Sequence, residues 1–168
     1  MKRILAAALV SLCAITPAFA SPLYAGIQVG DDSAGALLGY QINSTYAVEV
    51  HYSKTDSSNT QAGVTIDTDN VGTGLVGIAA FPMKLRDVVP YALFAKAGFQ
   101  HTSSTETYSI PSSATLTLPY NGSIHNKKNQ LIIGGGAEYE YSKYLTWRMG
   151  LDFIGKDNTF NVGAIFKF

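Results

Sequence analysis

Beyond the first twenty residues, apolar and polar side chains alternate with a period of two along most of the chain. The alternation recurs in eight segments, at residues 23–30, 35–42, 46–53, 71–81, 90–100, 130–141, 145–153 and 160–168. In the third segment, Tyr46, Val48, Val50 and Tyr52 share one face and Glu49 lies on the other. A period of two is that of a β-strand, and no stripe with helical spacing competes with it. The pattern therefore predicts an all-β fold of eight strands.

The lengths of the segments and of their connections indicate where these strands lie. Each segment has about 8 to 11 residues, the length that a tilted strand needs to cross a bilayer. Short connections at 31–34, 43–45, 83–87, 142–143 and 156–158 contrast with long polar segments at about 55–69 and 101–128. An even strand count with long loops at one end is typical of outer-membrane barrels. We predict an eight-stranded antiparallel up-and-down transmembrane β-barrel over residues 21–168, with both long loops outside the cell.

A soluble eight-stranded barrel of lipocalin type is the alternative, because periodicity alone does not say which face is inside. The polar face of the predicted strands interleaves long charged side chains with many glycines, such as Gly72, Gly74, Gly98, Gly134 and Gly136. In a narrow lumen, glycines leave room for the charged chains. On a solvated surface they would only weaken the strands. This mixture favours the membrane barrel, with its charges inside.

The first twenty residues have the organisation of a secretory signal peptide, with a basic start, a short apolar segment and a small-x-small end. We predict that residues 1–20 are cleaved after Ala20, which also removes Cys13, the single cysteine of the chain. The mature protein then has ten basic and twelve acidic residues, a net charge of −2. That balance argues against a nucleic-acid-binding surface, which needs concentrated positive charge.

Charged residues on the predicted lumen face form the first candidate site. They are Glu49, Lys96, Glu138, Glu140, Arg148 and Asp152. Eight strands leave room only for side chains inside the barrel, so the favoured interpretation is a network of ion pairs that fills the lumen. The alternative is a narrow channel that passes small ions when the pairs exchange. Buried charges must be paired in either case, so their presence does not by itself indicate transport.

A second candidate lies where the fifth strand enters the longest loop. His101 and Ser103 share the outward face, and Glu106 follows nearby. A Ser nucleophile with a His base and a carboxylate is a hydrolytic arrangement, and on this face it resembles the site of outer-membrane lipid A deacylases. The pair is not followed by Asn, and such triplets are common in Ser/Thr-rich segments, so we predict a non-enzymatic protein with the deacylase as the alternative. No cluster of His, Asp and Glu has metal-ligand spacing, and no cofactor is expected.

The two long polar segments are the third candidate, because loops on a rigid scaffold usually carry binding. We expect them to meet a host or surface ligand. Alternation at 64–66 and 115–118 suggests that strands extend into these segments. Lys127 and Lys128, near the outer rim, are candidates for contact with lipopolysaccharide phosphates.

Three stretches also carry a family resemblance. They are GALLGYQINSTYAVEVHYSKT, VVPYALFAKAGFQHTSS and the closing FIGKDNTFNVGAIFKF. They resemble strands of small outer-membrane barrels of the OmpA, OmpX and Opa/neisserial surface protein A group. The resemblance implies an outer-membrane location and a structural, adhesive or host-interacting role. Because the given sequence ends at Phe168, we expect no OmpA-type peptidoglycan-binding domain.

The same resemblance implies a set of partners for the barrel itself. The aromatic end of the last strand, with Phe160, Phe166 and Phe168, resembles the signal by which the barrel assembly machinery recognises such proteins. Periplasmic chaperones and outer-membrane lipid, including lipopolysaccharide, are then the expected partners, and the barrel is expected to be a monomer.

Overall fold

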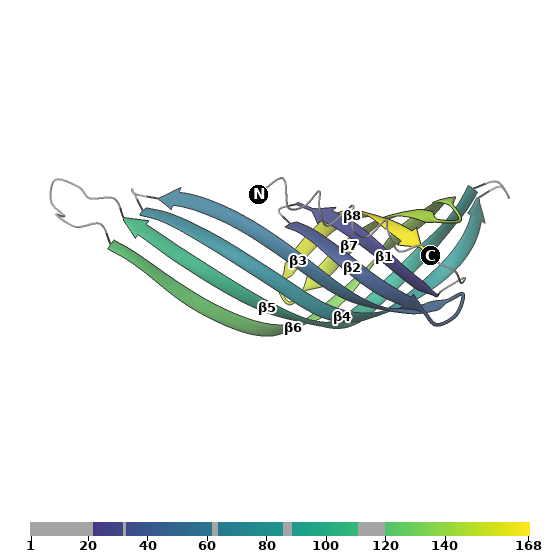
Figure 1. The fold of residues 1–168 in the computed structure, drawn as a ribbon, viewed down its shortest axis with the longest axis horizontal. Helices are drawn as coiled ribbons and strands as arrows, with labels where there is room; N and C mark the ends of the chain where they lie inside the picture. The colour runs from purple at the N-terminus through teal and green to yellow at the C-terminus, as the bar shows by residue number, and fades with distance from the viewer. Residues whose placement is uncertain (1–21, 32, 62–63, 86–88, 111–119) are drawn as a thin grey trace.

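The computed structural model describes residues 22–31, 33–61, 64–85, 89–110 and 120–168, and these residues form one closed antiparallel β-barrel (Figure 1). Its strands are β1 (Leu23–Gly30), β2 (Ser33–Gln41), β3 (Tyr46–Gln61), β4 (Val64–Leu85), β5 (Val89–Ile110), β6 (Tyr120–Ser142), β7 (Leu145–Ile154) and β8 (Asp157–Lys167). The predicted fold class is confirmed. Within the described residues, no helix is long and apolar enough to span a membrane.

Each strand pairs with its neighbour in the chain, and β8 returns to pair with β1. This last pairing runs in register from Tyr24 opposite Lys167 to Gly30 opposite Asn161. It leaves no open edge in this part of the sheet, so every strand there has a hydrogen-bonding partner on both sides. That closure is what a sheet needs in lipid, where no water can satisfy a free backbone group.

The alternation places the apolar side chains of these strands on the outside. Phe99 is 70% exposed, and Val50, Leu75 and Leu131 beside it are exposed as well. A smaller set of apolar side chains lies inside, where Val76, Ile78, Phe94 and Ile132 form one buried cluster and Tyr24, Leu37 and Ile165 form another. An apolar outer surface around a partly polar interior is the inverse of a soluble barrel and fits a lipid environment.

The four central strands are much longer than the sequence pattern predicts. The prediction of loops at about 55–69 and 101–128 is wrong, because these residues are in strands wherever the structure describes them. The β3–β4 pairing continues to Gln61 opposite Val64, and the β5–β6 pairing continues to Ile110 opposite Tyr120. The alternation at 64–66 does extend a strand, because β4 begins at Val64, whereas residues 62–63 and 111–119, which include the whole predicted alternation at 115–118, lie outside the described residues. Threonine is frequent here and suits a strand, but both faces are largely polar, so the hydrophobic alternation fades.

The two flanking hairpins stop well before these four strands do. Pairing of β2 with β3 ends at Ser33 opposite Thr55, and pairing of β7 with β6 ends at Ile132 opposite Ile154. Beyond those levels β3 to β6 continue as an open sheet, visible in Figure 1 as the long strands that project past the short ones. We call this part the extension, and it consists of residues 56–61, 64–71, 103–110 and 120–130.

Candidate functional site: the lumen charges and the outer cavity

Arg148, on β7, is the centre of the lumen charge network. Its guanidinium lies 2.7 Å from Oε1 of Glu49 on β3 and 2.6 Å from Oε1 of Glu138 on β6. Arg148 is 6% exposed and Glu49 2%. Tyr24 donates its hydroxyl proton to the same Glu49 oxygen at 2.7 Å, and the guanidinium stands over the ring of Phe94. Four strands thus converge on one buried arginine, and charge-assisted bonds of this kind are the strong ones.

A second buried pair lies farther toward the outer end. The ammonium of Lys96, on β5, is 2.7 Å from Oδ2 of Asp152 on β7. The amide of Asn161, on β8, donates to the same carboxylate oxygen at 2.9 Å. Both charged side chains are almost wholly buried, so the pair spans the interior rather than lying on a surface.

Above this pair, neutral side chains form a chain of hydrogen bonds across the barrel. His51 Nε2 is 3.2 Å from the Gln100 amide oxygen, and the Gln100 amide donates to the Thr102 hydroxyl at 3.2 Å. That hydroxyl donates in turn to Gln130 at 3.3 Å. The interior is therefore filled at three successive levels, by Arg148, by Lys96 and by this amide chain.

Five of the six predicted lumen charges are brought into these pairs, namely Glu49, Lys96, Glu138, Arg148 and Asp152. Glu140 is not among them. Its side chain is 48% exposed and lies 3.7 Å from the ammonium of Lys167, at the end of the barrel that carries the short turns. Glu140 lies two residues beyond Glu138, close to the end of β6, and water reaches its carboxylate there.

Tyr24 and Asn161 are hydrogen-bond partners of the lumen charges that sequence reasoning missed. Tyr24 lies on the lumen face of β1, and its ring occupies the space that a Cβ at Gly39 would fill. The available signal was its parity, because Tyr24 is the one aromatic among small and polar residues on that face of the first segment. Asn161 likewise shares the lumen face of β8 with Gly163 and Thr159. Their roles depend on the register between strands, which the alternation alone does not supply.

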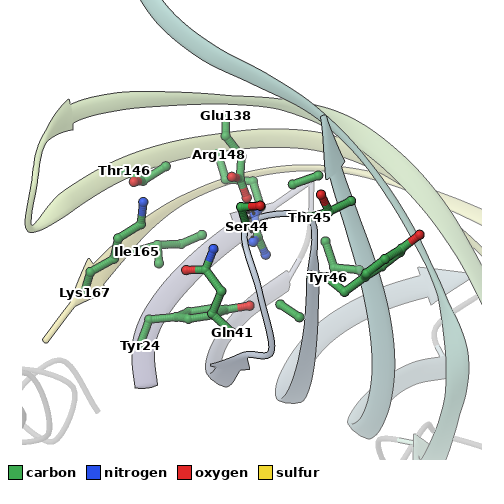
Figure 2. Close-up of a pocket in the computed structure, with 13 residues that line it drawn as sticks. Tyr24, Gln41, Ser44, Thr45, Tyr46, Glu138, Thr146, Arg148, Ile165 and Lys167 are labelled. Atoms are coloured by element: carbon green, nitrogen blue, oxygen red, sulfur yellow. Dashed lines mark hydrogen bonds and ion pairs between the residues drawn. The ribbon is translucent and has the colours of Figure 1, made fainter. Parts of the chain in front are cut away.

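A small cavity of about 60 Å³ lies between Arg148 and the short turns (Figure 2). Tyr24, Glu138 and Lys167 line it together with Thr146. The hydroxyl of Thr146 is buried without a hydrogen-bond partner among the described residues. A cavity of this size with several polar side chains in its lining has room for ordered water, which would satisfy that hydroxyl.

A larger cavity of about 530 Å³ opens at the other end of the barrel, against the inner face of the extension. It is lined by Asp31, Ser33, Ser53, Thr55, Thr68, Asn70, Gly72, Gln100, Thr102, Ser104, Glu106, Asn126, Lys128, Gln130, Ile154, Asp157, Asn158 and Thr159. We call it the outer cavity. Gln100, Thr102 and Gln130 belong both to its lining and to the amide chain, so the filled lumen closes its inner end.

The three residues of the hydrolase alternative do not meet. His101 is exposed on the outward face, where its Nδ1 lies 2.7 Å from the Asn129 amide oxygen. Glu106 has the opposite parity, lines the outer cavity and accepts a hydrogen bond from Tyr108 at 2.5 Å. The sheet therefore separates Glu106 from His101 and Ser103, and the geometry gives a catalytic relay no support. No group of three His, Cys, Asp or Glu side chains in the described part of the chain is placed to hold a metal ion.

The aromatic residues of the predicted assembly signal lie along β8 and at its end. Phe160 and Phe166 are exposed on the outward face, and the Phe168 amide donates to the Leu23 carbonyl at 3.4 Å. The last residue thus continues the pairing that closes the barrel. Recognition by the assembly machinery stays a prediction, as does cleavage of residues 1–20, of which the structure describes nothing.

Comparison with known proteins agrees with this architecture. A family model for the OmpA-like transmembrane domain matches residues 22–164. By sequence, no curated protein matches the chain.

Several solved structures share the fold at low sequence identity. The N-terminal β-barrel domain of Pseudomonas aeruginosa OprF superposes with a TM-score of 0.57 at 15% identity, covering 87% of this chain and 95% of that one. Neisserial surface protein A gives 0.53 at 12% identity, covering 87% and 94%. Ail, the attachment invasion locus protein of Yersinia pestis, gives 0.52 at 15% identity, covering 87% and 93%.

Proposed function

Because this chain belongs to the OmpA-like transmembrane domain family and is an outer-membrane β-barrel, we propose that it is a non-enzymatic surface protein whose outer end binds partners outside the cell. The observation that carries the proposal is the extension. It continues four strands beyond the level at which the barrel is closed. Long antiparallel strands hold a binding surface far more rigidly than free loops of equal length would.

The chemistry of the extension supports a role in water rather than in lipid. Its outward side chains are mostly hydroxyl, amide and charged groups, for instance Asp67, Asp69, Ser103 and Thr105. Lys54, just below its lower boundary, pairs with Asp56 at 2.7 Å while both remain exposed. A surface of this kind is costly to build into a bilayer and ordinary above one.

The filled lumen supports a binding role over a conducting one. Arg148 and Lys96 both hold carboxylate partners inside the barrel, and these pairs and the amide chain fill the lumen between the outer cavity and the small cavity near the short turns. We propose that the resting barrel does not conduct. Discrete conductance steps of the purified protein in planar bilayers would contradict this part of the proposal.

Contact with lipopolysaccharide is the second part of the proposed surface role. Of the two lysines near the rim, Lys127 has the outward parity and Lys128 lines the outer cavity. Lys127 is therefore the lysine that we propose meets a phosphate of the surrounding lipid, as a point charge. We further propose that the barrel acts as a monomer and that the barrel assembly machinery and periplasmic chaperones deliver it.

The role of the extension can be tested by comparing the adhesion of cells that display the full barrel with that of cells that display a barrel without the extension. Two Asn-Gly turns, replacing residues 56–69 and 105–125, would join the paired residues Thr55 to Asn70 and Ser104 to Asn126, since two-residue turns of this type close hairpins. Cells that display the full barrel should be retained on epithelial monolayers or polysaccharide-coated beads, and cells with the shortened barrel should not. Equal retention of both, at equal surface display, would contradict the proposal.

A further inference from the structure

The outer cavity has the form of a cup with one closed end. The amide chain through Gln100, Thr102 and Gln130 closes its inner end. Residues on the inner face of the extension make one wall, and this wall is tall because the strands of the extension continue past the short hairpins (Figure 1). The opposite rim is low, because the short hairpins end at Asp31 and Asp157. Its volume of about 530 Å³ is in the range of small-molecule sites, roughly 300–1,000 Å³. A ligand could enter over the low rim and could not pass on into the lumen.

The lining of the cup is dominated by neutral groups that both donate and accept hydrogen bonds. Twelve of its eighteen residues carry a hydroxyl or a carboxamide, among them Asn70, Ser104 and Asn126. Only Ile154 offers an apolar side chain. Hydroxyl groups of a ligand, which also donate and accept, match such a lining, whereas an acyl chain would leave most of it unsatisfied.

The charges of the cup exclude another class of ligand. Asp31, Glu106 and Asp157 contribute three carboxylates, and Lys128 is the one ammonium among the lining residues. A phosphorylated or sulfated ligand would therefore meet more repulsion than attraction. The lining thus selects against both lipids and polyanions.

The wall above the cup adds side chains that suit the apolar faces of a sugar ring. Tyr108 follows Glu106 on the inner face of β5, opposite Ile66 on β4. Its hydroxyl donates to the Glu106 carboxylate at 2.5 Å, and this hydrogen bond raises the pKa of Tyr108 above its ordinary value. The phenol therefore stays protonated and its ring is held in one orientation, next to a carboxylate oxygen that is still free to accept from a ligand hydroxyl.

We propose that the outer cavity binds a short neutral saccharide presented outside the cell. The proposal rests on the proposed surface role and names the ligand class for one part of the outer end. The hydroxyls and carboxamides of the cup would hold the sugar hydroxyls, Glu106 would accept from one of them, and the ring of Tyr108 would cover an apolar face.

Binding to purified protein tests this proposal apart from the surface role. The full mature barrel, folded in lauryldimethylamine oxide, a detergent without a sugar headgroup, would be titrated with maltotriose, triacetylchitotriose and galactotriose by saturation-transfer NMR. Sucrose octasulfate serves as the polyanionic comparison. We expect saturable binding of at least one neutral trisaccharide and at least about tenfold weaker binding of the sulfated sugar.

Matched variants on the two faces of the same strands locate the site. Asn126→Leu and Ser104→Val remove groups from the cup, whereas Asn129→Leu and Ser103→Val remove similar groups from the outward face. Each cup variant should weaken trisaccharide binding about tenfold, as expected for one lost hydrogen bond in a desolvated site, and the outward variants should not. Heat-modifiable migration in detergent gels verifies that each variant is folded.

Two results would overturn the saccharide site without touching the surface role. One is the lack of saturable binding by all three neutral probes, and the other is equal weakening by cup and outward variants. Conversely, trisaccharide binding in a protein whose shortened form still supports full cell adhesion would keep the saccharide site and remove the surface role.

Discussion

The extension continues four of the eight strands that form the closed barrel, yet the outward faces of the two regions have opposite chemistry. In the barrel, a row of paired residues shows Val50, Leu75, Phe99 and Leu131 to the outside, all of them exposed and apolar. Farther along the same strands the outward residues become charged, amide and hydroxyl groups. Backbone hydrogen bonding continues unchanged through this transition. Side-chain chemistry alone therefore sets the level at which the membrane ends.

The two regions also differ in what an ion pair can contribute. Arg148 and Glu49 are buried and the Glu138 side chain is only 17% exposed, whereas the Lys54 and Asp56 side chains are both about half exposed at a similar distance. Removing one partner of a buried pair leaves a charge in a medium that solvates it poorly, while an exposed partner simply returns to water. Loss of one partner should therefore destabilise the barrel strongly in the interior and only slightly near the extension.

The largest expected effect comes from breaking the Arg148 pairs. Arg148→Leu leaves the buried Glu49 and the partly buried Glu138 without their cation and should lower the free energy of unfolding by about 3–5 kcal/mol. Unfolding in urea from lipid vesicles, followed by Trp147 fluorescence, would measure it. Lys167→Met, which breaks the half-exposed pair with Glu140, should cost at most about 1 kcal/mol.

The charges themselves can be separated from the packing in the same assay. Adding Glu49→Gln and Glu138→Gln to Arg148→Leu should recover part of the lost stability, because no unpaired carboxylate remains. A triple variant as unstable as Arg148→Leu alone would contradict the assignment of these residues to one network.

The next effect concerns the space that glycines leave inside the barrel. A Cβ at Gly39 would collide with the ring of Tyr24, so Gly39→Ala should displace Tyr24 from Glu49 and cost about 1–3 kcal/mol. Gly77 is outward-facing, and its nearest atom to a new Cβ is the Ala97 carbonyl oxygen at 3.9 Å. Gly77→Ala should therefore change stability by no more than about 0.5 kcal/mol, and equal costs for the two variants would refute the account.

The smallest effect is electrostatic and lies in the extension. The hydrogen bond from Lys54 lowers the pKa of Asp56 below its ordinary value of 3.8. Because the pKa of Asp56 is lower in the folded state than in the unfolded state, its ionisation stabilises the extension at pH values above the unfolded-state pKa. This contribution is lost as the pH falls through the folded-state pKa. The Asp56 carboxyl carbon should therefore titrate below 3.8 in NMR and move back toward that value in Lys54→Met. An unchanged titration would show that the pair does not persist in solution.

Much of the closed barrel was predictable because its strands alternate between two environments. Burial inside and lipid outside impose opposite demands on neighbouring residues, so the parity of Glu49, Lys96 and Arg148 already assigned them to the lumen. Their choice of partners was not predictable, since it depends on how the strands are staggered. Glu140 has the correct parity and lies too near the rim to be buried.

The extension was not predictable for the same physical reason. Both of its faces are largely hydrated, so the residue types at positions such as Thr105 and Asn126 do not indicate which face of the sheet they occupy. A polar strand and a polar loop then look alike in the sequence. The outer cavity, which depends on the extension for one wall, was therefore invisible as well.

The most direct test of the account is the position of the membrane boundary on the outward face. Once Cys13 leaves with the predicted signal peptide, the chain has no cysteine, so single cysteines can be introduced without interference. Two sets of outward positions suffice, one at Leu75, Phe99 and Leu131 and one at Asp69, Thr105 and Lys127. A membrane-impermeant maleimide applied to intact cells should label the second set and leave the first set unlabelled until the protein is denatured. Equal labelling of both sets, or protection of the second set, would contradict the account.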